Sequence, residues 1–380
     1  MTRRRTYLDW NATAPLRPTA RAAMLAALDL AGNPSSVHTE GRAARRLIED
    51  AREQVAALVG ASPRSVYFTS GATEANAWVH GQSWKTIVFS RLEHVSVLAS
   101  IDASDADRRE VAATRDGTLD LDALVATLSG AAHALAEAPG RALLTLQAAN
   151  NETGVVQPVV AAIDIAKAHG IRVASDAVQM AGRARLDFDG SDLDYMTISA
   201  HKFGGPKGIG AVIARPDAPL APLMIGGGQE RRQRAGTENV AAIAGFGAAA
   251  EEAARDLGAN AAVSALRDRL ETSVRARAPN TVIIGQNAPR LPNTTCLALP
   301  GRAAETLVAA FDLAGVAVSA GSACSSGKVA ASHVLSAMDL EAGLVRGSIR
   351  ISLGATTTTD DIAAFLAAFD DITARIAHAA

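Results

Sequence analysis

The sequence contains little cysteine, little lysine and almost no net charge. Only two of its 380 residues are cysteines, Cys296 and Cys324, which excludes a disulfide framework and a four-cysteine metal or iron–sulfur site. The 37 lysines and arginines nearly balance the 39 aspartates and glutamates, so the net charge of −2 gives no reason to expect a nucleic acid as a partner. Covalent lysine chemistry has five candidates: Lys85, Lys167, Lys202, Lys207 and Lys328.

Long hydrophobic runs are also missing. The most apolar stretch, residues 240–250, is interrupted by Gly245 and Gly247 and is too short to span a bilayer. The arginines at positions 3–5 are not followed by an apolar run, which argues against a signal peptide. We therefore expect a cytoplasmic protein with no membrane partner.

The rest of the composition is typical of a globular protein. Hydrophobic residues make up 48% and charged residues 20%, and the length fits roughly two domains. Short β-branched runs alternate with amphipathic helical stretches as far as about residue 240, which predicts an α/β fold with a mostly parallel sheet covered by helices on both faces. After that point the pattern indicates a smaller α+β domain. We assign residues 15–255 to the large domain, and residues 1–14 and 256–380 to the small one.

Hydrophobic periodicity also places individual elements. Helices are predicted at 42–59, 159–168, 240–255, 261–277 and about 360–377. Strands are predicted at 66–69, 87–89, 142–146, 171–174, 195–198, 209–213, 282–284, 294–299, 316–318 and 348–352.

Ser70-Gly71-Ala72-Thr73-Glu74 lies between a predicted strand and a predicted helix. Its small residues let backbone N–H groups face an anion, and the helix N-terminus adds a partial positive charge. These features favour a phosphate site, in which Thr73 adds a hydroxyl donor. The pattern also fits an ordinary N-cap with an acidic residue in the first turn.

Two polar side chains follow predicted buried strands, where ligands bind in parallel sheets. Asp176 follows the strand at 171–174, and it either pairs with a cation such as a protonated pyridine nitrogen or caps a helix. Lys202 lies between His201 and a Gly-Gly-Pro turn, after the strand at 195–198. Burial there would favour the neutral amine that forms a Schiff base, whereas a surface lysine in a turn is the alternative.

Taken in order, these motifs resemble the class V aminotransferase family, whose members use pyridoxal 5′-phosphate (PLP) and have fold type I. Within that family the sequence is similar to the cysteine desulfurases of the NifS/IscS type, group I. The resemblance runs nearly end to end, and further segments carry it: Tyr7-Leu8-Asp9, Glu93-His94, Asn150-Asn151-Glu152-Thr153-Gly154, Arg234-Ala235-Gly236-Thr237, Ser319-Ala320-Gly321-Ser322-Ala323-Cys324 and Ser348-Ile349-Arg350. It implies the fold of PLP-dependent transferases, with a mostly parallel seven-stranded sheet, PLP as cofactor and L-cysteine as substrate.

The resemblance implies roles around the cofactor ring. Lys202 would bind PLP as a Schiff base, and Asp176 would keep the pyridine nitrogen charged, which makes the ring an electron sink. Gln179 would hydrogen-bond the ring hydroxyl, and His94 would stack on the ring face. From the residues alone, a histidine at a helix start is the favoured interpretation of His94, and the resemblance reverses it.

The resemblance also implies contacts to the phosphate and to the substrate. Thr237 would reach the cofactor phosphate of the other subunit in a homodimer. Asn150 and Arg350 would bind the substrate carboxylate, although Arg350 without the family pattern would be interpreted as a solvated charge. The remaining phosphate contacts would come from Ala72, Thr73, Ser199 and His201.

The two cysteines lie in contrasting surroundings. Cys324 lies in a Gly/Ser-rich stretch with almost no bulky side chain, which predicts a loop and suits a thiol nucleophile. Cys296 lies in an apolar run and is predicted to be a core residue of a strand. The resemblance implies that Cys324 takes sulfur from L-cysteine, leaving L-alanine, and passes the persulfide to a sulfur-acceptor protein or thiol.

Other functions fit parts of the pattern. A selenocysteine lyase or an aminotransferase of the same fold type would have an incidental Cys324, and a non-catalytic PLP-binding protein would not need it at all. A nicotinamide-dependent oxidoreductase is disfavoured because no G-x-G-x-x-G fingerprint opens a βαβ unit. The pathway that receives the sulfur, whether iron–sulfur cluster assembly, tRNA thiolation or another cofactor synthesis, is not specified by these motifs.

Overall fold

The computed structural model describes residues 5–321 and 331–377. Its largest sheet has seven strands in the order β2-β8-β7-β6-β5-β3-β4. Neighbouring strands are parallel, except that β8 runs antiparallel to β2 and to β7. The predicted mostly parallel sheet is therefore confirmed. The strands are β2 (Val66–Thr69), β3 (Thr86–Ser90), β4 (Asp107–Val111), β5 (Ala142–Thr145), β6 (Arg172–Asp176), β7 (Tyr195–Ser199) and β8 (Gly210–Ala214).

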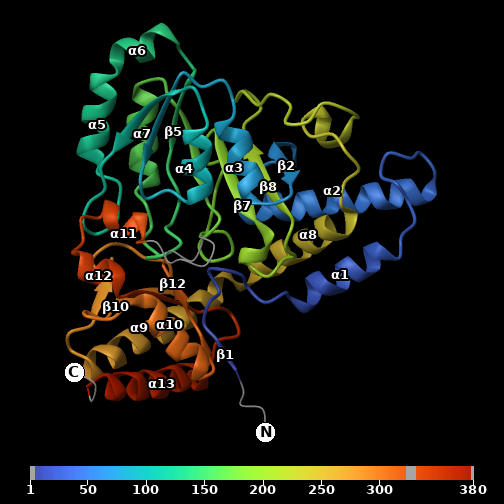
Figure 1. Cartoon of the computed structure of the whole chain (residues 1–380). Helices are drawn as coiled ribbons and strands as arrows, with labels where there is room; N and C mark the ends of the chain where they lie inside the picture. The colour runs from blue at the N-terminus through green and yellow to red at the C-terminus, as the bar shows by residue number, and fades with distance from the viewer. Residues whose placement is uncertain (1–4, 322–330, 378–380) are drawn as a thin grey trace.

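Each face of this sheet packs against its own helices, because alternate residues of a strand point to opposite faces. Val88 and Leu144 belong to the cluster under α2, α5, α7 and α8, whereas Ile87 and Leu143 belong to the cluster under α3 and α4. Figure 1 shows these helices on both sides of the sheet. The helices are α2 (Thr39–Val59), α3 (Ala72–His80), α4 (Val95–Asp102), α5 (Leu121–Gly130), α6 (Ala132–Glu137), α7 (Val159–Ala168) and α8 (Val240–Arg255).

The helix α8 lies alongside α2 and α1 (Pro18–Leu28), as Figure 1 shows. The helix α2 begins after His38, whose side chain accepts from Gly41 N, and it ends at Gly60. Gly60 has φ 63°, a left-handed conformation that strains any residue with a Cβ, so the glycine terminates the helix. Arg52 in the middle of α2 is buried and pairs with Glu230 across the packed surface.

The C-terminal part forms a second hydrophobic cluster. Its antiparallel sheet has the order β12-β13-β10-β9, and β1 (Thr6–Tyr7) pairs in parallel with β11 (Val316–Ala317), so the N-terminal segment joins this part. The separate cluster supports our proposed division at residues 14/15 and 255/256. The other elements are β9 (Val282–Ile284), β10 (Thr294–Ala298), β12 (Ser319–Ala320), β13 (Ser348–Ser352), α9 (Asn260–Arg277), α10 (Ala304–Leu313), α11 (His333–Ala337), α12 (Ala342–Arg346) and α13 (Thr359–Ala377).

The strand β4 is the one strand of the large sheet that periodicity did not predict. Arg108, Arg109 and Glu110 interrupt its apolar pattern, because β4 is an edge strand whose charged side chains face solvent. The predicted bounds of α7, α8, β9 and β13 match the structure. Within the described ranges, none of the helices combines the length and the hydropathy that crossing a membrane requires.

Candidate active site

A cavity of about 550 Å³ lies at one edge of the large sheet. The strands β2, β3, β5, β6 and β7 point the same way, so the segments that follow them meet at this edge. The volume lies in the range of roughly 300–1,000 Å³ typical of small-molecule sites. Eight of the residues that are predicted to contact the cofactor line this cavity: Ala72, Thr73, His94, Asp176, Gln179, Ser199, His201 and Lys202.

The segment after β2 has the strand–turn–helix form that the sequence predicts. Ser70 N donates to Glu74 Oε2 at 3.0 Å, and the helix α3 begins at Ala72. Glu74 also forms an ion pair with Arg234. Because Glu74 bonds both Ser70 and Arg234, it fixes the conformation of the turn. The first N–H groups of α3 then face the cavity.

Asp176 is the last residue of β6, and it does not cap a helix. Its Oδ2 accepts from Asn76 Nδ2 at 2.9 Å, and its Oδ1 accepts from Val178 N at 3.0 Å. Thr197 Oγ1 donates to Asn76 Oδ1 at 2.7 Å, which fixes the Asn76 amide. The carboxylate is 9% exposed and lines the cavity, so the alternative of a helix N-cap is wrong.

Lys202 ends a short 3-10 turn, Ala200–Lys202, directly after β7. Its Nζ donates to Asn11 O at 2.8 Å and to Ala12 O at 3.0 Å. The amine is therefore held inside the cavity by the N-terminal segment, so the alternative of a plain surface lysine is wrong. Lys207, another of the five candidate lysines, also lines the cavity but is exposed.

Both cavity histidines are kept neutral by their surroundings. Burial lowers the pKa of His94, whose Nδ1 accepts from Ser96 N at 3.1 Å and thereby leaves the ring proton on Nε2. Burial and the charge of Lys202 lower the pKa of His201 to about 4. His201 Nδ1 lies 2.6 Å from Thr13 Oγ1. His94 is thus the N-cap of α4 and also lines the cavity, while its stacking on a cofactor ring stays a prediction.

Asn151, and not Asn150, lies in the cavity. Asn150 is fully buried: its Oδ1 accepts from Glu152 N and Thr153 N at 2.8 and 2.9 Å, and its Nδ2 donates to Leu92 O. These contacts fold the Asn-Asn-Glu turn and engage both polar atoms of the Asn150 amide. The neighbouring Asn151 lines the cavity.

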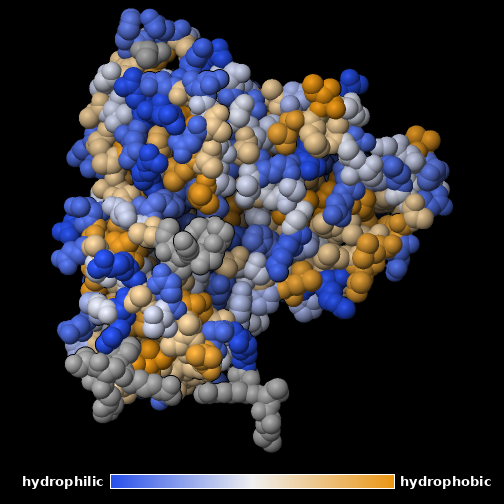
Figure 2. All heavy atoms as spheres, viewed as in Figure 1, coloured by the Kyte–Doolittle hydropathy of each residue, from blue (hydrophilic) through white to orange (hydrophobic). Residues whose placement is uncertain are grey.

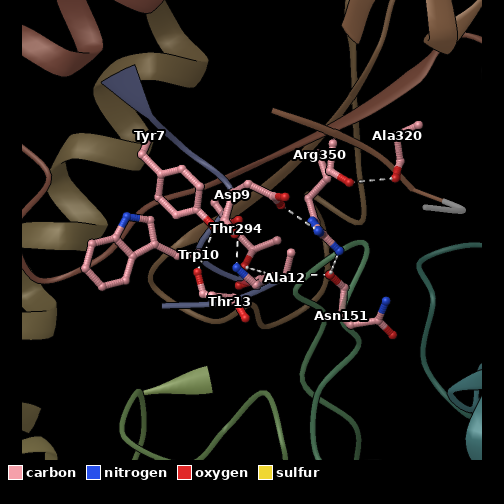
Figure 3. A network of polar contacts seen from close by, with 12 residues as sticks. Tyr7, Asp9, Trp10, Ala12, Thr13, Asn151, Thr294, Ala320 and Arg350 are labelled. Atoms are coloured by element: carbon pink, nitrogen blue, oxygen red, sulfur yellow. Dashed lines mark hydrogen bonds and ion pairs between the residues drawn. The ribbon is translucent and has the colours of Figure 1, made fainter. Parts of the chain in front are cut away.

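Arg350 is buried at 4% exposure, so the interpretation as a solvated charge is wrong. Figure 3 shows its Nη2 donating to Asp9 Oδ1 at 2.7 Å and its Nη1 donating to Asn151 O at 3.0 Å. Its Nε is buried with no hydrogen-bond partner among the described residues. Arg350 lines the cavity and retains one donor for an anion.

The remaining predicted residues are not in the described cavity. Thr237 is exposed and does not line it, although Arg234, three residues earlier, is tied to Glu74. Cys324 lies outside the described residues. Cys296 is fully buried in β10, and burial raises the pKa of its thiol, so its prediction as a strand core residue is confirmed.

Several polar residues of the site were not predicted. Asn76, Ser96 and Gln147 support or line the cavity, and Asn11 contacts both Lys202 and Gln179. A signal existed for Asn76 only, because it interrupts the buried face of α3 formed by its apolar neighbours. Asn11 and Gln147 lie outside helices and strands, and Ser96 lies in the first turn of α4, so no periodicity distinguishes them from surface residues.

The fold and the site together define a class of protein. A mostly parallel seven-stranded sheet that brings a lysine, a carboxylate and a helix N-terminus to one cavity is fold type I, the fold of a large class of PLP-dependent enzymes. The chain belongs to the class-V aminotransferase family: the family description "Aminotransferase class-V" matches residues 6–365. The family expected from the motifs is confirmed.

Known proteins resemble the chain over nearly its whole length. A cysteine desulfurase of Cereibacter sphaeroides is 42% identical over 370 aligned positions, which cover 94% of this chain and 93% of the relative. An IscS-like cysteine desulfurase of Mycobacterium tuberculosis is 39% identical, with 98% of both chains covered. The solved structure of a NifS-like protein from Rickettsia africae superposes with a TM-score of 0.88 at 34% identity, covering 97% of this chain and 99% of that one.

Proposed function

We propose that this protein is a PLP-dependent cysteine desulfurase, which converts L-cysteine to L-alanine and holds the released sulfur as a persulfide on Cys324. One observation carries the proposal: a single cavity contains the Lys202 amine, the Asp176 carboxylate and the Arg350 guanidinium with an unpartnered Nε. The three groups match a carbonyl, a pyridine nitrogen and a carboxylate, and relatives with 38–42% identity are called cysteine desulfurases.

The residues present fit PLP. Asp176 offers a buried carboxylate for a ring nitrogen, and the Ser70–Glu74 turn offers N–H groups at the start of α3 for a phosphate. His201 and Ser199 line the same cavity as this turn, and the neutral His94 ring suits stacking. Bound there, PLP supplies the electron sink that stabilises a carbanion on the substrate.

Lys202 is the group that we expect to move the substrate proton. Its Nζ lies between the carbonyl oxygens of Asn11 and Ala12, which accept hydrogen bonds and orient the amine. The same amine would hold PLP before the substrate arrives. The neutral His201 and His94 add no competing positive charge, so a released Lys202 amine can take the α-proton.

Arg350 and Asn151 are proposed to bind the substrate carboxylate. Arg350 is held by Asp9 on one edge and has its Nε free of partners among the described residues, while Asn151 lies beside it. We expect the amide contact to the substrate carboxylate to come from Asn151 and not from Asn150, since the Asn150 amide is already engaged.

Cys324 is proposed to be the sulfur carrier. Its thiolate attacks the sulfur of L-cysteine: an S–S bond forms, the substrate C–S bond breaks, and the electron pair stays on the substrate carbon, which is protonated to alanine. Gly321, which precedes Cys324 by three positions in the sequence, lines the cavity, and this supports the proposal. The persulfide then passes to an acceptor protein or thiol.

A homodimer is proposed as the working form. Thr237 is exposed, and Arg234, three residues earlier, pairs with Glu74 of the turn between β2 and α3, so a second copy could use Thr237. Figure 2 shows apolar side chains on the surface over α1 and over the segment before Arg234. They include Leu16, Leu25, Leu28, Leu223, Met224 and Ile225. A second copy of this chain would cover the apolar surface over α1 and the one before Arg234, and its Thr237 would complete the phosphate contacts.

The test is intact-mass measurement after incubation with L-cysteine. We expect one added sulfur atom on wild-type protein and on Cys296→Ser, and none on Cys324→Ser, which should keep its yellow PLP absorbance. Lys202→Ala should lose the absorbance of the Schiff base. Alanine formation by Cys324→Ser at the wild-type rate would instead indicate a lyase in which Cys324 is incidental, and would overturn the proposal.

A further inference from the structure

Arg183 is a buried cation that donates to neutral oxygens. Its Nη1 donates to Gln179 Oε1 at 2.5 Å and to Gln179 O at 2.7 Å, and its Nη2 donates to Trp10 O and Lys202 O at 3.3 and 3.2 Å. No carboxylate oxygen of residues 5–321 or 331–377 lies within 4.0 Å of this guanidinium. Burial lowers the pKa of Arg183 to about 9, and the charge of Arg350 adds to the effect.

Other buried arginines of the chain differ from Arg183 in this respect. Arg52 forms two hydrogen bonds with Glu230, and Arg290 forms two with Glu271. A buried charge without a counter-ion is costly. The contacts of Arg183 to Gln179 and Lys202 indicate what the charge does.

Arg183 determines which end of the Gln179 amide can meet a ligand. Gln179 Oε1 accepts from the guanidinium, and Gln179 Nε2 donates one hydrogen to Asn11 O at 3.1 Å. Gln179 lines the cavity, so the group that remains to face it is the second N–H of Nε2. A flipped amide would bring two donors together at Arg183, which excludes the other orientation.

We propose that Arg183 is a positioning residue that locks Gln179 as a hydrogen-bond donor toward an anionic oxygen in the cavity and holds the backbone carbonyl of Lys202. The inference rests on the proposed function, because the oxygen is then the ring hydroxyl of PLP in its deprotonated form. The Gln179 N–H, oriented by the buried Arg183 guanidinium, would stabilise the negative charge on this oxygen. The same oxygen would share a proton with the Schiff base on Lys202.

The expected consequence is a low pKa for that Schiff base. Every other charged or titratable group that lines the cavity stays unchanged in the test: Glu74, Asp176, His94, His201, Lys207 and Arg350. Removing one nearby charge and its oriented donor typically shifts a pKa by about one unit or more. We therefore expect the pKa of the Schiff base to rise by about one unit in Arg183→Met.

The test is an absorbance titration of the resting holoenzyme against pH, without substrate. It compares wild type with Arg183→Met, with Arg183→Lys, which keeps the charge, and with Gln179→Ala alone and combined with Arg183→Met. We expect a raised pKa in Arg183→Met, a value close to wild type in Arg183→Lys, and less than half of the shift when Gln179 is already alanine.

Two results would overturn the inference. One is an unchanged pKa in Arg183→Met that still folds and binds PLP. The other is a full shift in the Gln179→Ala background, which would mean that the charge acts without Gln179. If Arg183→Met does not fold, the comparison of Arg183→Lys with Gln179→Ala decides. A positioning role predicts a Schiff-base pKa near that of wild type in Arg183→Lys and a shifted pKa in Gln179→Ala. Retention of the absorbance in Lys202→Ala would refute the proposed function instead.

Discussion

Asp9 and Arg350 form an ion pair in which Arg350 Nη2 lies 2.7 Å from Asp9 Oδ1 (Figure 3). A carboxylate from the N-terminal segment therefore already occupies one edge of the guanidinium at the cavity wall. Since Nη1 is engaged by Asn151 O, a substrate carboxylate has to approach beside these partners. The planar fork of an arginine can serve all three, which a lysine ammonium cannot.

Arg350→Lys should raise KM for L-cysteine about tenfold to hundredfold, because it loses a charge-assisted hydrogen bond of about 1.5–3 kcal/mol. The affinity for PLP should change little, and steady-state kinetics with a PLP titration measure both. Arg290→Lys is the matched control, since Arg290 is also buried and paired, with Glu271, but does not line the cavity. An unchanged KM in Arg350→Lys would remove this residue from the substrate site.

Gly210→Ala should weaken the phosphate turn. A Cβ at Gly210 would lie 2.8 Å from Gly71 Cα and 2.7 Å from Ile198 O, so the turn after β2 has to move. We expect about tenfold weaker PLP binding, the loss of one hydrogen bond of about 1.4 kcal/mol, in an absorbance or fluorescence titration. Gly130→Ala, where a Cβ meets no atom within 4 Å, should bind PLP as wild type does. Equal affinities in the two variants would contradict the assignment.

Glu93 should make the protein less stable as pH rises. Burial raises the pKa of Glu93 from 4.5 to about 8, and its Oε2 has no hydrogen-bond partner among the described residues. Between these values the folded state holds a proton that the unfolded state has lost, so stability falls with rising pH, by at most about 1.4 kcal/mol per pH unit.

Glu93→Gln cannot titrate, so its thermal midpoint should decline less than that of wild type between about pH 5 and pH 8. Glu110→Gln, at an exposed edge-strand position, should follow wild type throughout. Parallel curves for Glu93→Gln and wild type would show that Glu93 is ionised in the folded state.

Glu230→Ala should destabilise the protein by about 3–5 kcal/mol, because it leaves Arg52 buried without its carboxylate. Both side chains are 2% exposed, and Glu230 also accepts from Phe68 N at 2.9 Å. The shift of the urea midpoint measures this loss. Asp102→Ala breaks the exposed pair with Arg108 and should cost no more than about 1 kcal/mol. Similar shifts in both variants would mean that the buried pair contributes nothing beyond a surface pair.

The sequence predicted well what depends on local periodicity and on the order of strand ends. The strand ends at Asp176 and Lys202 are set by buried runs, and parallel strands then bring the two side chains to one edge. Asn150 and Asn151 show the limit, because two adjacent identical residues are distinguished only by the turn that engages one amide. Arg350 shows another limit, since its burial depends on Asp9, 341 residues away in sequence.

Arg183 was missed for a related reason. An arginine in a turn resembles a surface residue, and only the packing of Trp10 and Lys202 around it makes it buried. Long-range contacts of this kind leave no mark on neighbouring residues, so a single sequence carries no signal for them. The edge strand β4 was missed because its charged residues hide the alternation of apolar and polar side chains that is typical of a strand.

The pairing of β1 with β11 affects the order of events during synthesis. Thr6 is made first, yet its partner Val316 follows about 310 residues later, which takes about 15–60 s at roughly 5–20 residues per second. The hydrophobic cluster of the large sheet is complete by Ala253 and can form in the meantime. Asn11 and Ala12, which hold Lys202, lie just beyond β1. The N-terminal contacts to Lys202 can therefore take their final place only after Val316 has been made, and cofactor loading should not precede that step.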